Sequence, residues 1–244
     1  MKYYESKSKI ANSILSFIHS YIMLNNIDTY IEPFVGGCNI IDKVVCTNKF
    51  AYDKNKYLIE LLRYLQNGGE LPDEITREQY MDCKAHYNAN DKYYPDWLLG
   101  AVGFLAGTGN KLYDGTYINS RSDYKDEKET LIEQMRSLTD VEFNCEDYKN
   151  LHPKNCLIYS DPPCSGSKGY ESVSKEFNYK EFWDIMREWS KDNIVLISEK
   201  CAPDDFDIIW EQETDNISDT KNRATEKLFI HKSLNIDDNS DFDF

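Results

Sequence analysis

The sequence predicts an open, mostly parallel α/β sheet with helices on both faces and an inserted helical and loop region. Short apolar runs that suit strands alternate along the chain with longer segments whose apolar residues recur at helical spacing. The runs at residues 156–160 and 194–199 are largely apolar without alternation, which is typical of central strands covered on both faces. With 244 residues, of which 41% are hydrophobic, the chain is long enough for one large domain of this class.

The individual elements follow from local patterns. Ile10, Ile14 and Ile18 share one face of an expected helix, and a Gly-Gly pair ends the leucine-rich helix that follows the second strand. A polar stretch rich in Gly, Asn and Tyr predicts a loop or hairpin. In chain order we expect a helix from about residue 10, a strand at Thr29–Glu32, a glycine loop and a helix, a strand at 49–53, helices after residue 55, near 77–89 and near 95–106, a loop or hairpin at 107–127, a helix at about 127–138, strands at 141–145 and 156–160, a helix at 179–191, and strands at 193–199, 206–213 and 226–232.

We expect these elements to form three parts of the chain. The sheet domain comprises residues 1–66 and 141–234, and residues 67–140 form the inserted region. Residues 235–244, NIDDNSDFDF, carry four Asp and no basic residue, and we interpret them as an acidic disordered tail.

Composition excludes several classes of protein. The net charge of −15 means that the overall field of the chain does not attract phosphate backbones, so any nucleic-acid binding needs a local basic surface. The seven cysteines are an odd number without Cys-x-x-Cys spacing, which argues against a zinc site and against a disulfide framework, and the histidines are scattered. No apolar run approaches the roughly 20 residues that span a bilayer, and the start of the chain is too polar for a secretory signal. We therefore expect a cytoplasmic protein without a metal or a membrane segment.

Three expected strand ends carry carboxylates. Glu32 ends the first strand, Asp53 ends the second, and Asp161 follows the apolar run at 156–160. In open α/β sheets, ligands bind beyond the carboxyl ends of the strands, near the point where the strand order reverses. We expect these side chains to meet in one cleft, which makes this edge of the sheet a candidate active site.

The first two strand ends suggest a nucleoside cofactor. Gly36 and Gly37 remove side chains where the backbone turns sharply or approaches a ligand. Asp53 stands where an acid can bond the hydroxyls of a ribose, although it could equally cap the helix that begins near Asn55. Neither a Gly-x-Gly-x-x-Gly pattern nor a P-loop is present, so a cofactor without phosphates is favoured.

Four motifs in this order resemble a known family. They are EPFVGG at residues 32–37, YDKN at 52–55, DPP at 161–163 and NIVLISE at 193–199. Together they resemble the amino-methylating DNA methyltransferases, and most closely the Dam-type adenine group, including its phage members. The resemblance implies a Rossmann-like methyltransferase sheet that binds S-adenosylmethionine, with the inserted region as the target-recognition region.

The resemblance also implies roles for particular cofactor-binding residues. Glu32 would meet the methionine ammonium group, and Asp53 would hold the ribose. Lys7 would match a lysine of the amino-terminal motif, although Glu5-Ser6 stand where the family usually has glycine, and Tyr3, with Tyr4 as its competitor, would stack on the cofactor. The remaining cofactor-binding candidates are Pro33, Phe34, Gly36, Gly37 and Asp161.

At the third strand end, the residue types suit transfer of a methyl group to the N6 amine of adenine. This amine is a poor nucleophile because its lone pair is delocalised into the ring. Asp161 and the backbone carbonyl of Pro162 would accept its two hydrogens, while Pro162 and Pro163 stiffen the backbone. The implied activity is that of a site-specific DNA methyltransferase, and the catalytic candidates are Asp161, Pro162, Pro163 and Cys164.

Cys164 departs from the family, which has tyrosine after the two prolines to stack on the flipped base. One interpretation is an active enzyme with a weakened base clamp, since a stacking contact is worth roughly 1–3 kcal/mol. A second is an inactive module that binds DNA or protein. A third is a cytosine-C5 methyltransferase with Cys164 as nucleophile. The sequence leaves these three open.

Double-stranded DNA is the implied partner, and the middle of the chain holds the candidate contacts. Basic and aromatic residues alternate there, which suits contact with phosphates and bases, although neighbouring acids dilute the charge. The oligomeric state stays open, with a monomer favoured. The DNA-binding candidates are Lys111, Tyr113, Tyr117, Asn119, Arg121 and Lys125.

Overall fold

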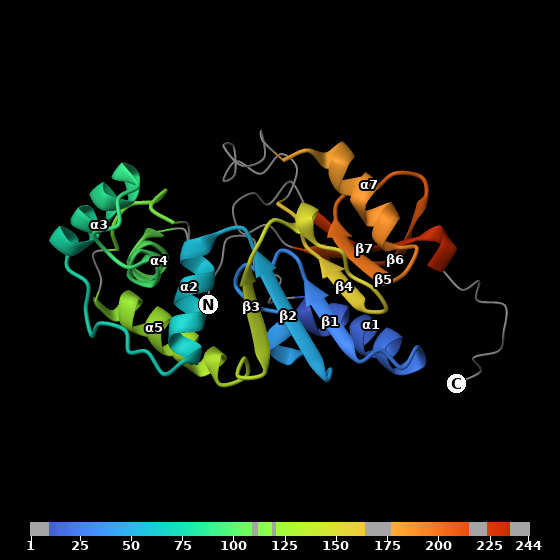
Figure 1. The fold of residues 1–244 in the computed structure, drawn as a ribbon, viewed down its shortest axis with the longest axis horizontal. Helices are drawn as coiled ribbons and strands as arrows, with labels where there is room; N and C mark the ends of the chain where they lie inside the picture. Colours follow the sequence, from blue (N-terminus) through green and yellow to red (C-terminus); the bar gives the residue numbers. More distant parts are fainter. Residues whose placement is uncertain (1–9, 109–111, 119–120, 164–176, 215–223, 235–244) are drawn as a thin grey trace.

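A computed structural model describes residues 10–108, 112–118, 121–163, 177–214 and 224–234. Its centre is a sheet of seven strands in the order β3-β2-β1-β4-β5-β7-β6 (Figure 1). β7 runs antiparallel to β5 and β6, whereas the other neighbouring strands pair in parallel. The strands are β1 (Thr29–Glu32), β2 (Asn48–Asp53), β3 (Val141–Cys145), β4 (Leu157–Ser160), β5 (Ile194–Glu199), β6 (Phe206–Thr214) and β7 (Ala224–His231).

This sheet confirms the predicted fold class. The order β3-β2-β1-β4-β5 is that of a doubly wound α/β sheet, and β1 and β4 flank the point where the strand order reverses. The helices are α1 (Ala11–Leu24), α2 (Lys56–Gln66), α3 (Arg77–Ala89), α4 (Asp96–Leu105), α5 (Arg121–Met135) and α7 (Tyr179–Trp189), with 3-10 turns η2 (Ile41–Lys43), η4 (Tyr148–Asn150) and η5 (Lys232–Leu234).

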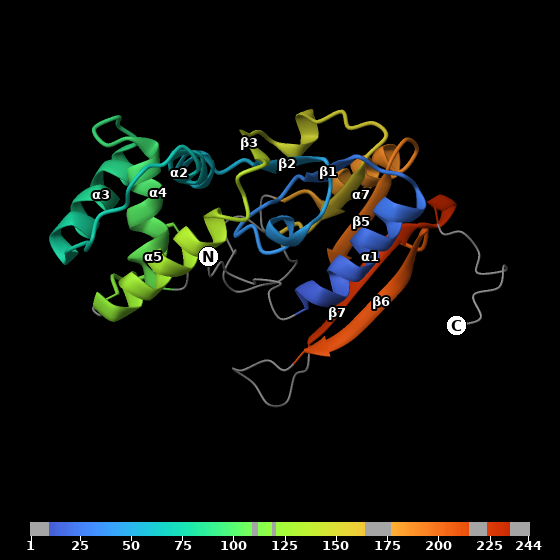
Figure 2. The ribbon, with the colours of Figure 1, turned by 90° about the horizontal axis from the view of Figure 1, so that it is seen from below.

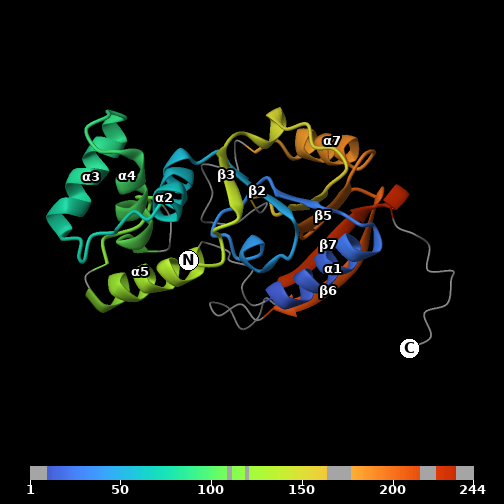
Figure 3. The ribbon, with the colours of Figure 1, turned by 60° about the horizontal axis from the view of Figure 1, so that its bottom comes forward.

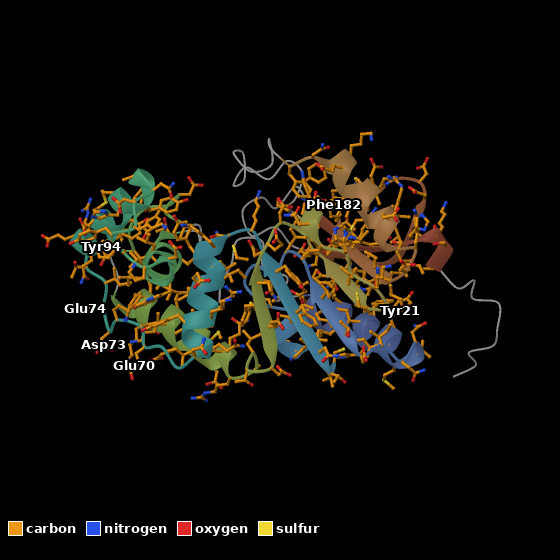
Figure 4. The ribbon with its side chains drawn as sticks, in the orientation of Figure 1. Tyr21, Glu70, Asp73, Glu74, Tyr94 and Phe182 are labelled. Carbon is orange, nitrogen blue, oxygen red and sulfur yellow. The ribbon has the colours of Figure 1, made fainter. Side chains whose placement is uncertain are left out.

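Successive residues of the central strands feed two cores, one on each face of the sheet. In β4, Leu157 and Tyr159 join the core that includes α1, whereas Ile158 joins the core that includes α7. This alternation arises because neighbouring side chains of a strand point to opposite faces. Figures 2 and 3 show α1 and α7 on the two sides of the sheet, and Phe182 of α7 lies fully buried against it (Figure 4). Covering of both faces explains why these strands read as apolar runs.

Helices α3, α4 and α5 lie beyond the β3 edge of the sheet, next to α2 (Figure 1). α2 and α4 pack closely because α4 presents Gly100 to α2. A Cβ atom at Gly100 would lie 2.2 Å from the backbone oxygen of Tyr57. The connection from α2 to α3 carries Glu70, Asp73 and Glu74 along the outer edge of this region (Figure 4).

Two predicted elements are wrong in their extent. The helix expected after the glycine loop is only the 3-10 turn η2. The few residues after this turn must return to the start of β2, and an α-helix rises only about 1.5 Å per residue, against about 3.3 Å for an extended chain. The helix expected from residue 127 begins at Arg121 instead. Its first turns are anchored by Tyr124, which is buried and donates a hydrogen bond to the Pro72 carbonyl.

Residues 106–108 pair with residues 116–118, as the predicted hairpin requires. Gly107 and Tyr117 form an antiparallel bridge, and the Ile118 amide donates to the Ala106 carbonyl. No helix in the described part of the chain is long and apolar enough to cross a bilayer.

Candidate cofactor and active site

The carboxyl ends of β2, β1 and β4 are neighbours in the sheet, so Asp53, Glu32 and Asp161 lie along one edge. The Gly36 amide donates to Asp53 Oδ2 at 3.2 Å, and the Val35 amide donates to the Tyr52 carbonyl at 2.9 Å. These bonds hold the loop after β1 against the end of β2. The predicted convergence of the strand ends is therefore present in the fold.

Glu32 is a buried carboxyl group, with 3% of its surface exposed. The Tyr30 hydroxyl donates to its Oε1 at 2.7 Å. Burial, with smaller contributions from the nearby Asp161 and Asp42, raises the pKa of Glu32 from 4.5 to about 8, against the opposing effect of the Tyr30 hydrogen bond. Because several acids share this edge, the site favours a bound cation.

Asp53 uses both carboxylate oxygens to shape the backbone. Oδ1 accepts from the Asn55 amide at 2.9 Å, and Oδ2 accepts from the Gly36 amide. Burial raises its pKa, and these two bonds oppose the rise. The helix cap is a different residue, since the Asn55 side chain accepts from the Tyr57 and Leu58 amides at the start of α2. The capping role considered for Asp53 thus belongs to Asn55, and its ribose contact stays a prediction.

A side chain of the helical region, by which we mean helices α2 to α5 and the segments that connect them, holds the glycine loop. Gly36 has φ +46°, in the left-handed region that favours glycine. The side chain of Gln134 on α5 donates to the carbonyls of Gly37 and Cys38, each at 3.0 Å. Sequence reasoning missed Gln134, because a single glutamine on a polar helix face carries no motif.

Aromatic side chains wall the same edge. Phe34 packs against Tyr148, Phe177 and Phe182, with ring centroids 4.8, 6.0 and 6.1 Å away. The Tyr148 hydroxyl is buried and has no hydrogen-bond partner among the described residues. Pro33 and Gly37 are buried next to Phe34. The sequence predicted only Phe34 as a residue of this wall, because the other rings come from elements that are distant along the chain.

The catalytic candidates follow β4 directly. Asp161 is half-buried and Pro162 is buried, while the Pro163 carbonyl accepts a hydrogen bond from the Tyr179 hydroxyl at the start of α7. Tyr179 was not foreseen as a site residue. Cys164, Tyr3 and Lys7 lie outside the described residues, so their roles stay predictions.

The DNA-binding candidates are dispersed. Tyr113 is 3% exposed and packs against Tyr80 and Tyr87 at 5.5 and 4.9 Å between ring centroids, which places its ring inside the helical region. Tyr117 is half-buried and donates to the Ile75 carbonyl at 2.6 Å. Lys125 is exposed and lies 3.6 Å from Glu129. Lys111, Asn119 and the side chain of Arg121 lie outside the described residues.

No cluster of three or more His, Cys, Asp or Glu side chains that could hold a metal ion occurs within the described ranges.

Comparison with known families finds a match for the first part of the chain. Residues 3–96 match the family described as D12 class N6 adenine-specific DNA methyltransferase. The resemblance read from the motifs is confirmed. The D12 match includes Glu32, the glycine loop and Asp53, whereas Asp161 and the strands after it lie beyond the matched residues.

Two modification methylases are similar to this chain at low identity. Modification methylase StsI of Streptococcus sanguinis is 22% identical over 188 residues, and type II methyltransferase M.FokI of Planomicrobium okeanokoites is 25% identical over 187 residues. Each alignment covers 67% of this chain and 28% of the relative, so the chain spans little more than a quarter of the length of these relatives.

Solved methyltransferase structures align over most of the chain at low similarity. A magnesium protoporphyrin IX methyltransferase from Synechocystis, determined with bound S-adenosylmethionine, aligns over 92% of this chain and 79% of its own with a TM-score of 0.41 and 8% identity. A candidate methylase from Haemophilus influenzae aligns over 91% of this chain and 88% of its own with a TM-score of 0.37 and 7% identity.

Proposed function

We propose that this protein transfers a methyl group from S-adenosylmethionine to the N6 amine of adenine in double-stranded DNA. The observation that carries the proposal is the convergence of Glu32, Asp53 and the Asp161-Pro162 step on adjacent strand ends. Asp161 is close enough to Glu32 to raise the pKa of that carboxyl, so the proposed cofactor and base sites are contiguous. The D12 match at residues 3–96 supports the same reaction.

The residues at this edge fit a cationic nucleoside cofactor. Buried Glu32 lies among acids, and a ligand ammonium group would supply the missing cation. Asp53 would hold the ribose with lone pairs beyond those used by Gly36 and Asn55. Phe34 and Tyr148 would line the cofactor. The Tyr148 hydroxyl, which has no partner among the described residues, is a polar group that a ligand can satisfy. When bound, S-adenosylmethionine supplies an electrophilic methyl group on a sulfonium.

The chain itself prepares the amine for attack. The Asp161 carboxylate accepts one amine hydrogen and the Pro162 carbonyl accepts the other, which directs the nitrogen lone pair away from both acceptors. Pro162 and Pro163 restrict the backbone, and the Tyr179 hydroxyl holds the Pro163 carbonyl from α7. Positioning of this kind lowers the barrier because the acceptors are oriented before the reaction.

Identification of the modified nucleoside tests this proposal. Purified protein is incubated with labelled S-adenosylmethionine and unmethylated DNA, the DNA is digested, and the labelled nucleoside is identified. N6-methyladenine is the expected product and should vanish in Asp161→Ala. Labelled 5-methylcytosine would assign Cys164 as a nucleophile instead. The absence of label from DNA, with cofactor binding retained, would favour an inactive binding module.

A further inference from the structure

Several basic side chains on or next to helices α2 and α5 are neutralised by ion pairs. Lys56 lies 3.1 Å from Asp96, Lys128 lies 3.1 Å from Asp73, and Arg136 lies 2.6 Å from Glu133. Arg77 and Lys84 of α3 differ, because neither forms an ion pair within the part of the chain that the structure describes.

Arg77 and Lys84 line the same cavity, which has a volume of about 250 Å³. They stand seven residues apart on α3, so they lie on one helix face about 10 Å apart along the axis. Met81, which is 54% exposed, lies between them and lines the cavity with Tyr80. The opposite wall is the turn at residues 115–117.

This turn is fixed by hydrogen bonds and by its glycine. The Thr108 amide donates to the Thr116 carbonyl at 2.7 Å, and the Tyr80 hydroxyl donates to the Gly115 carbonyl at 3.4 Å. A Cβ atom at Gly115 would lie 2.0 Å from the Thr108 oxygen, so only glycine fits this approach. Tertiary contacts therefore fix the wall of the cavity that the turn forms.

The acids of α3 do not occupy this face. Glu78 and Asp82 are four residues apart in α3, so they share one helix face, and this face is not the one that carries Arg77 and Lys84. Asp82 accepts a hydrogen bond from Tyr94 and lies 3.9 Å from His86. Asp114, at the edge of the turn, is exposed. The face that lines the cavity is thus locally positive on an acidic protein.

We propose that the cavity between α3 and the turn at residues 115–117 binds the sugar-phosphate backbone of the DNA substrate, with Arg77 and Lys84 on phosphates and Met81 against the sugars. This inference rests on the proposed function. The spacing of the two cations suits a chain of phosphates better than a single anion, because one DNA strand carries a phosphate about every 3.4 Å along its axis. The overall acidity of the protein makes such a local site necessary, since the general field repels the backbone.

The salt dependence of DNA binding tests the site. The affinity of the full chain for an unmethylated duplex is measured over a series of salt concentrations, with S-adenosylhomocysteine present. Affinity falls as salt rises, and each neutralised phosphate contributes about 0.9 to the steepness of log affinity against log salt. The double variant Arg77→Ala, Lys84→Ala should therefore make this dependence shallower by about 2.

A matched pair controls for net charge. Arg136→Ala with Lys154→Ala removes the same two charges, from an arginine paired with Glu133 and an exposed lysine that precedes β4. This control should keep the wild-type slope. Equal slopes for wild type and the α3 variant, or equal losses in both double variants, would overturn the site and leave the proposed function intact. A wild-type protein that binds no DNA would overturn both. Thermal unfolding of each variant verifies the fold.

Discussion

The side-chain amide of Gln134 on α5 lies 3.0 Å from the carbonyl oxygen of Gly37, to which it donates a hydrogen bond across 97 residues of sequence. The same nitrogen lies 3.0 Å from the carbonyl oxygen of Cys38 and 3.0 Å from Asp42 Oδ2. The helical region therefore holds the loop that we assign to the cofactor. Three consequences concern this edge of the sheet, and two concern the catalytic step.

Gln134→Ala should weaken binding of S-adenosylmethionine. Loss of two hydrogen bonds of about 1 kcal/mol each releases the glycine loop, which corresponds to roughly a thirtyfold change in dissociation constant. Calorimetric titration measures the effect. Gln66→Ala is the control, because this amide donates in the same way to the carbonyls of Leu138 and Val141, away from the glycine loop. Equal losses in both variants would show that the Gln134 effect is general destabilisation.

Tyr148→Phe should stabilise the ligand-free protein while weakening cofactor binding. The buried hydroxyl of Tyr148 has no partner among the described residues, and such a group costs about 1–3 kcal/mol. Urea unfolding should therefore show a gain of up to that size. The comparison is Tyr117→Phe, which removes a hydroxyl that donates to the Ile75 carbonyl and should lower stability. A loss of stability in Tyr148→Phe would mean that its hydroxyl is satisfied in the folded protein.

Glu32 should make the ligand-free protein less stable as the pH rises. Burial raises the pKa of Glu32 from 4.5 to about 8, so between these values the folded protein retains a proton that the unfolded chain has lost. Stability then falls with increasing pH across this window and levels off above it. Glu32→Gln cannot ionise and should lack this decline. Urea unfolding at several pH values measures the difference, and parallel curves for the two proteins would contradict the prediction.

Tyr179→Phe should lower the rate of methylation with little effect on cofactor binding. Its hydroxyl holds the Pro163 carbonyl beside the proposed amine acceptors, and loss of about 1 kcal/mol of positioning corresponds to roughly a fivefold lower rate. Single-turnover kinetics measure it. Tyr64→Phe removes a comparable hydroxyl, which bonds the Glu70 carbonyl in the helical region, and should leave the rate unchanged. An unaltered rate in Tyr179→Phe would remove the positioning role.

Cys164→Tyr should raise methylation of adenine. If only the stacking partner of the flipped base is missing, a restored contact of roughly 1–3 kcal/mol increases the rate by up to about a hundredfold. Asp161→Ala should abolish activity in both backgrounds. Loss of wild-type activity in a folded Cys164→Tyr protein would contradict this interpretation, and a covalent adduct with a mechanism-based cytosine analogue would assign Cys164 as a nucleophile.

The sequence by itself determined the sheet and the outline of its functional edge. Residues 157–160 and 194–199 form central strands whose two faces are both buried. Burial on both faces requires consecutive apolar residues, and a run of this kind can be recognised in the sequence. Glu32, Asp53 and Asp161 could be predicted as neighbours because parallel strands bring their carboxyl ends to one edge. The short turn after the glycine loop was not predictable in this way, because its path depends on the distance back to β2.

Only the tertiary structure decided which side chains support that edge and where the free cations lie. Gln134, Tyr148 and Tyr179 reach the site from α5, η4 and α7, and no spacing along the chain relates them to the motifs they contact. The same holds for Tyr113, whose sequence neighbourhood suited DNA contact but whose ring fills the interior of the helical region. Local pattern fixes the type and order of elements, whereas contacts between residues far apart in the chain form only when those elements pack. For this reason no sequence pattern marks the basic face of α3, where Arg77 and Lys84 have no acidic partner among the described residues.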